Sequence, residues 1–131
     1  MGYKEVRHTA DVAIRAWGDS LEELFTSAAR GMFSLIGEAD SDRSVHIIKL
    51  SADDLETLLV DWLTELIYLS DAHQEAYHQF DVRLTPSWEL EAVIRGGPIG
   101  RRTGAVKAAT YHGLRIEAKQ GAYSATIVFD T

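Results

Sequence analysis

Two carboxylate residues near opposite ends of this 131-residue chain could hold a hard metal ion together. Asp11 lies in a polar junction between two predicted strands, and Asp130 follows Phe129 and the β-branched run at residues 126–128. Thr131 adds a terminal carboxylate beside Asp130. The ends of a domain often lie close together, so these oxygen atoms could meet at one place. Oxygen ligands of this kind suit Ca²⁺, Mg²⁺ or Mn²⁺ and do not suit a soft metal.

Each of these residues also has a simpler structural explanation. An aspartate in a junction between strands more often accepts local hydrogen bonds than binds a ligand, and Asp130 could merely end its strand. Lys107 interrupts the apolar residues 106–109. It is either a strand lysine whose ammonium reaches water or a cation fixed beside the carboxylates. His8 and His112 could ligate a metal or move protons, but His112 precedes a glycine and therefore suits a turn.

Composition limits the function classes. The chain has no cysteine, which excludes disulfides and thiolate chemistry. Its net charge of −7 argues against direct nucleic-acid binding and favours a basic protein partner or a cation. The longest apolar stretch, residues 55–69, carries Asp61 and Glu65 and is too short to cross a bilayer. No signal peptide is recognisable, so we expect a cytoplasmic protein with one domain over residues 1–131.

The hydrophobic pattern indicates an α+β fold. Alternation predicts strands at residues 3–8 and 12–17, and capping boxes start helices at Ser20 and Ser51. Polar residues 70–79 predict a loop, and glycines at 96–100 predict a flexible turn. Further strands follow, and the last ends at Asp130. We expect a mixed, largely antiparallel sheet with two helices on one face, and the shorter strands could form a second small sheet.

Several motifs in order resemble the archease family over nearly the whole chain. They are HTADV at residues 8–12, SLEELF at 20–25 with AARGMF at 28–33, LLVDWL at 58–63, VKAATYHGL at 106–114 and VFDT at 128–131. Two departures are visible. Thr131 stands where the family often ends in isoleucine, and residues 100–104 differ from the family's usual polar loop.

The resemblance implies an activator without catalytic residues of its own. Archeases assist an RtcB-type RNA ligase in tRNA splicing and RNA repair, and they promote its guanylylation and multiple turnover. The family's metal ligands fall on Asp11, Asp130 and the terminal residue Thr131, with calcium as the first expectation and magnesium or manganese as alternatives. An activating lysine matches Lys107. The resemblance implies neither direct nucleic-acid binding nor a membrane partner.

Two other function classes remain open at this point. A chaperone-like module that binds other proteins is one. The second is a small metal-dependent hydrolase that would use Asp11, Asp130 and His112. No serine lies in a nucleophile elbow and no histidine pair has metalloprotease spacing, so the pattern gives the hydrolase little support.

Overall fold

The computed structural model describes residues 1–7 and 11–131. In chain order its elements are β1 (Gly2–Arg7), β2 (Val12–Gly18), α1 (Leu21–Ile36), β3 (Gly37–Ala39), β4 (Ser44–Ser51), α2 (Leu55–His73), β5 (Glu75–Leu84), β6 (Glu89–Arg102), β7 (Ala108–Ala109), β8 (Glu117–Lys119) and β9 (Ala122–Asp130).

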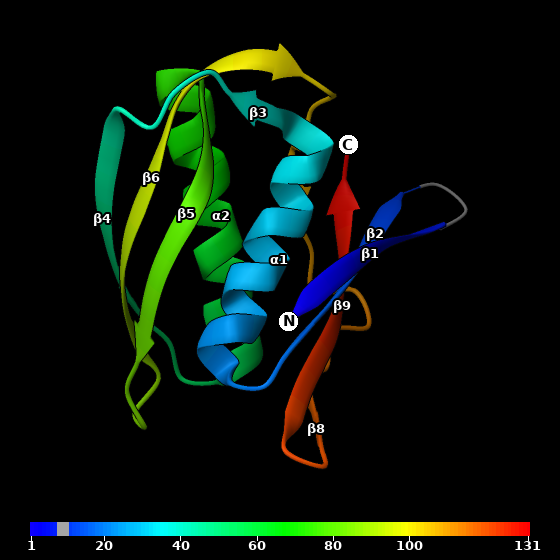
Figure 1. Ribbon diagram of the computed structural model, residues 1–131. Coiled ribbons are helices and arrows are strands. Elements are labelled where there is room, and N and C mark those ends of the chain that lie inside the picture. The colour runs from blue at the N-terminus through cyan, green and yellow to red at the C-terminus, as the bar shows by residue number, and fades with distance from the viewer. Residues whose placement is uncertain (8–10) are drawn as a thin grey trace.

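The strands form two antiparallel sheets with both helices between them (Figure 1). The first sheet has the order β1-β2-β9-β7, and β8 pairs with the other end of β9. In the second sheet β6 is the long strand with which β3, β4 and β5 pair. The α+β class with two helices and largely antiparallel strands is confirmed. The second sheet is larger than expected, so the helices are covered on two sides.

The first helix begins and ends as its sequence predicts. The Ser20 hydroxyl accepts a hydrogen bond from the Glu23 amide at 3.1 Å, and the helix ends at Gly37. The prediction for the second helix is wrong by one turn, because Asp54 and not Ser51 is its N-cap. The Asp54 carboxylate accepts from the Thr57 amide at 2.7 Å. This bond lowers the pKa of Asp54.

The predicted loop at residues 70–79 is wrong. Helix α2 continues to His73, and one residue, Gln74, joins it to β5. Gln74 has a left-handed backbone with φ of 54°, and its amide donates to the Ser70 carbonyl. The Ser70 hydroxyl donates to the Glu75 carbonyl at 2.6 Å, which closes the connection. Two hydrogen bonds therefore make the tight reversal that composition alone does not indicate.

The predicted flexible turn at residues 96–100 is also wrong, because β6 runs through it without a break. A Cβ on Gly96 would lie 1.9 Å from the Ala76 carbonyl oxygen of β5, and one on Gly97 would lie 2.4 Å from the Ser41 hydroxyl. Glycine is therefore needed at these positions because neighbouring chain segments approach closely, and not because the segment is flexible.

The core lies between the sheets and along both helices. Trp62 of α2 is fully buried, and its indole N–H donates to the Phe25 carbonyl of α1 at 3.0 Å. Ile14 of β2 and Phe129 of β9 are fully buried in the same cluster. Within the described residues, no helix combines the length and apolar character needed to cross a membrane.

Candidate functional site

The start of β2 and the end of β9 meet at one corner of the first sheet. Val12 pairs directly with Phe129, so Asp11 precedes and Asp130 follows the same rung of the ladder. Side chains alternate across a strand. Because Ile14 and Phe129 enter the core, Asp11 and Asp130 belong to the opposite face. We call Asp11, Asp130 and Thr131 the acidic corner. Asp11 is half-buried, while Asp130 and Thr131 are exposed.

Strand β7 brings Lys107 to the acidic corner. Ala108 pairs with Asp130, and the Lys107 amide donates to the Asp130 carbonyl oxygen at 2.8 Å. The Lys107 side chain is exposed. Within the described residues, its ammonium lies within ion-pair distance of neither Asp11 nor Asp130. The main chain of Lys107 is thus fixed beside the carboxylates, and its charge stays available for contact with another molecule.

The donor chemistry of the acidic corner fits a hard cation. Asp11 and Asp130 flank the paired residues Val12 and Phe129, and Thr131 follows Asp130. In the part of the chain that the structure describes, no three His, Cys, Asp or Glu side chains gather as a metal-binding group. A cation here would therefore need the terminal or main-chain oxygens and water in addition to the two aspartates, as Ca²⁺ and Mg²⁺ accept.

Of the two histidine candidates, His112 lies within the described residues and His8 lies outside them. His112 is exposed in the connection between β7 and β8, and its amide donates to the Thr110 hydroxyl at 3.3 Å. Thr110 in turn donates to the Val128 carbonyl of β9 at 2.9 Å. His112 therefore sits in a turn that is tied to β9.

A second polar cluster, missed by the sequence reasoning, joins β4 to β5. The Glu75 carboxylate accepts hydrogen bonds from the Ser44 hydroxyl, from the Tyr77 hydroxyl at 2.8 Å and from His46 Nε2 at 2.8 Å. The side chain crosses β6 near Gly96, which pairs with both Ser44 and Tyr77 and has no side chain. The sequence held a hint of this cluster. Ser44 and His46 alternate with Val45 and share the inward face of β4 with the apolar residue Ile48.

The hydrogen bonds of this cluster set the ionisation of its acids. Burial alone would raise the pKa of Glu75, but the bonds from Ser44, His46 and Tyr77 and the charge of His46 outweigh burial and lower that pKa. Burial, the bond to Glu75 and the Glu75 charge all raise the pKa of Tyr77. Glu75 is therefore held as a carboxylate and Tyr77 as a neutral donor.

Glu75→Gln should lower the free energy of unfolding at pH 7 by about 1–3 kcal/mol, because three donors lose a charged acceptor. The folded-state pKa of Glu75 is lowered, so its contribution is full above the ordinary value of 4.5 and is lost as the pH falls below it. Urea unfolding from pH 7 to pH 3 should show a larger loss in the parent protein than in the variant, in which other carboxylates with a lowered pKa, such as Asp54, still contribute. Glu91→Gln, which changes an exposed residue, should keep the parent profile.

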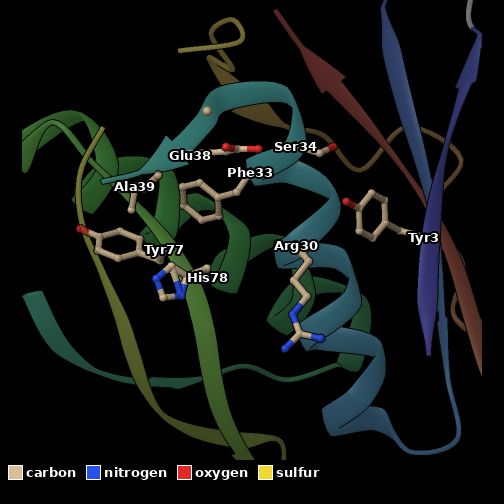
Figure 2. A pocket seen from close by; sticks show the side chains of 10 residues that line it. Tyr3, Arg30, Phe33, Ser34, Glu38, Ala39, Tyr77 and His78 are labelled. Atoms are coloured by element: carbon tan, nitrogen blue, oxygen red, sulfur yellow. The ribbon is translucent and has the colours of Figure 1, made fainter. Parts of the chain in front are cut away.

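A cleft of about 470 Å³ lies over α1, between β1 and β5 (Figure 2). Tyr3 forms one wall, and the opposite wall includes Tyr77 and His78. Arg30 and Glu38 give the lining opposite charges. None of the candidate residues Asp11, Lys107 and Asp130 lines this cleft. It is therefore a separate feature from the acidic corner.

Comparison with known proteins decides the family. Residues 3–131 match the archease protein family. The chain belongs to the archease family. An archease of Saccharolobus islandicus is 41% identical over 130 residues, covering 94% of each chain. An archease of Methanosarcina mazei is 33% identical over 138 residues, covering 98% of this chain and 94% of its own.

Solved structures of archease relatives have the same fold. The solution structure of Methanobacterium thermoautotrophicum protein 1598 superposes with a TM-score of 0.83 at 26% identity, covering 99% of each chain. The crystal structure of a Thermotoga maritima protein, described as an archease and possible chaperone, gives 0.71 at 27% identity. It covers 98% of this chain and 96% of its own. The architecture around the acidic corner is thus an archease architecture.

Proposed function

We propose that this archease-family protein activates an RtcB-type RNA ligase in tRNA splicing and RNA repair. The observation that carries the proposal is the pairing of β2 with β9, which leaves Asp11 and Asp130 flanking the Val12–Phe129 rung, with the Lys107 main chain bonded to Asp130. A divalent cation, calcium first, would bind to the two aspartates and the Thr131 carboxylate. The bound cation would place positive charge next to oxygen atoms of the ligase.

The residues around the acidic corner support distinct roles in this proposal. Asp11 and Asp130 would orient the cation, because they are on one face and flank the same pair of residues. Lys107 would contact the ligase, because its main chain is held by Asp130 while its side chain remains exposed. A net charge of −7 suits docking near the basic channel that a ligase needs for RNA.

Asp130→Asn should abolish the stimulation of ligation that the parent protein gives when the ligase is substoichiometric. The amide keeps the size of the side chain and removes the charge that attracts a cation. Turnovers per ligase are counted with the parent protein, with Asp11→Asn, with Asp130→Asn and without helper. Asp81→Asn changes an exposed aspartate of β5 and should retain the stimulation. Equal stimulation by a folded Asp130→Asn protein would refute the role of the acidic corner.

Calcium should raise the thermal unfolding midpoint of the parent protein and of Asp81→Asn, but not that of Asp130→Asn. A ligand that binds only the folded state adds about 2.7 kcal/mol at 100 times its Kd. Differential scanning fluorimetry with calcium, magnesium, manganese and chelator would measure this shift. If none of the three ions shifted the unfolding midpoint of the parent protein, the cation would be removed from the proposal. The ligation assay would still test the activation.

A chaperone-like function is the second candidate, because the Thermotoga maritima relative is described as a possible chaperone. It predicts suppressed aggregation of several unrelated proteins at equimolar ratio. The ligase role instead predicts stimulation of one partner at catalytic concentration. Aggregation assays with two unrelated substrates, run beside the ligation assay, separate these candidates.

A further inference from the structure

The face of the first sheet that points away from the helices carries a basic strip. Ile14 and Ala16 enter the core, so Arg15 and Trp17 between and after them belong to the outer face. Lys4 of β1 lies directly opposite Arg15, and Thr126 of β9 lies on its other side. We call Lys4, Arg15, Trp17, Arg115, Ser124 and Thr126 the outer strip.

Two cations of the outer strip lie opposite each other, and among the described residues its cations have no partner. Like charges directly across an antiparallel pair destabilise a sheet, and Lys4 and Arg15 are such a pair. Within the described residues, neither side chain, nor that of Arg115, forms a hydrogen bond or an ion pair. The same face also carries Asp11, Asp130 and Glu117, but among the described residues none of these carboxylates pairs with Lys4, Arg15 or Arg115. The three cations are therefore left to contact an anionic ligand.

A small hollow marks where an anion would sit. It has a volume of about 80 Å³ and is lined by residues of β2, β9, β8 and the segment that leads into β8. Arg15 and Arg115 both line it, together with the hydroxyl residues Ser124 and Thr126. Glu117 is the one acidic residue in this lining. Two guanidinium groups with adjacent hydroxyls suit the oxygen atoms of a phosphate.

Trp17 gives the outer strip an aromatic surface. A Cβ on Gly2, its direct partner, would lie 2.7 Å from the indole ring, so the ring lies across Gly2 where any side chain would collide. Trp17 is still 37% exposed. The ring therefore covers the glycine backbone and keeps part of its surface accessible to a flat ligand.

We propose that the outer strip binds single-stranded RNA, with a base stacked on Trp17 and phosphates held by Lys4, Arg15 and Arg115. Successive rows on one face of a sheet are about 6.7 Å apart, so the Trp17 row and the Arg15 row lie one step apart. Proteins that bind single strands combine aromatic stacking with a basic track. The net charge of −7, which argued against nucleic acid, averages over the whole surface and hides this strip.

An acidic protein segment is the competing occupant of the outer strip. The contribution of Trp17 to binding distinguishes it from single-stranded RNA. Carboxylates would contact Lys4, Arg15 and Arg115 but would gain little from an open indole face. Single-stranded RNA gains from the cations and from the indole, because its phosphates contact the cations and its flat bases stack on the ring. The inference concerns residues outside the acidic corner, and it holds or fails whether or not the protein activates a ligase.

Anisotropy of a fluorescein-labelled 12-mer of uridine, titrated with the full chain at low salt, tests the proposal. Trp17→Leu should weaken binding by roughly five-fold or more, and Trp17→Phe should restore most of it. The double variant R15E/R115E should weaken binding by roughly ten-fold and flatten its salt dependence. Arg83→Glu changes an exposed arginine of the second sheet and should stay within about two-fold of the parent. Thermal midpoints check that each variant folds.

Three results would overturn the proposal. The first is no measurable binding of the 12-mer by the folded parent protein. The second is equal weakening by Arg83→Glu and by R15E/R115E, which would mean diffuse charge attraction only. The third is a polyglutamate peptide that binds as tightly as the 12-mer and depends on Arg15 and Arg115 but not on Trp17. This last pattern would assign the outer strip to an acidic protein partner.

Discussion

Replacing Gly96 with alanine should destabilise the protein by at least about 3 kcal/mol, the upper part of the range for an overpacked interior. The new Cβ would lie 1.9 Å from the Ala76 carbonyl oxygen and 2.7 Å from the Tyr77 Cα. Both are backbone atoms of the paired strand β5, so no side-chain rotation can relieve the collision. Strands β5 and β6 would have to move apart, and the hydrogen bonds of Glu75 would be lost with them.

Urea unfolding followed by far-ultraviolet circular dichroism measures this loss. Gly104→Ala is the matched control, since its Cβ would meet one neighbouring atom, the Leu35 carbonyl oxygen, at 3.0 Å. It should cost well under half as much. A Gly96→Ala protein as stable as the Gly104→Ala protein would show that β5 is not held as close to β6 as described.

Phe129→Ala should cost about 3–5 kcal/mol, because it empties the space of a fully buried aromatic ring. The effect should reach the acidic corner as well. Phe129 pairs with Val12 and with Ala109, so it anchors the strand end that carries Asp130 between β2 and β7. We therefore expect the calcium-dependent rise of the thermal midpoint to shrink in this variant.

Ile47→Ala is the control for that experiment. Ile47 is 67% exposed on β4, and truncation of an exposed residue usually changes stability by less than about 0.5 kcal/mol. The calcium response should be unchanged in Ile47→Ala. If Phe129→Ala lost stability but kept the full calcium response, the cation would not depend on the position of the β9 end.

The local signals of the first helix were sufficient to predict it. Ser20 and Glu23 have the spacing of a capping box, and the structure has the Ser20 cap with a helix that ends before Gly37. The alternation that predicted the first two strands and the last one was equally informative. These elements depend on neighbours within a few residues, which is the range that a pattern can describe.

Residues 70–79 could not be predicted in the same way, because distant partners determine their structure. Glu75 and Tyr77 are polar, but inside the fold the Glu75 carboxylate accepts hydrogen bonds from Ser44 and His46 of β4 as well as from Tyr77. The glycines at 96–100 misled for a related reason. They are required by the closeness of β5, which the sequence around them does not reveal.

The candidate site was partly predictable. The expectation that the first hairpin lies next to the last strand agrees with the pairing of β2 and β9. Cation binding by Asp11, Asp130 and Thr131 stays a prediction. The outer strip was hidden for a physical reason, since Lys4, Arg15 and Arg115 come together only when three separate segments form one sheet face.

The position of β9 also has a consequence for the order of folding. The second sheet is built from residues between 37 and 102, whereas the first sheet joins β2 to a strand from the far end of the chain. Closing so long a loop costs entropy before any contact repays it, and such pairings form slowly. The helices and the second sheet can assemble before the β1–β2 hairpin pairs with β9. We therefore expect the acidic corner to be among the last parts to form and to exist only in chains that have finished folding.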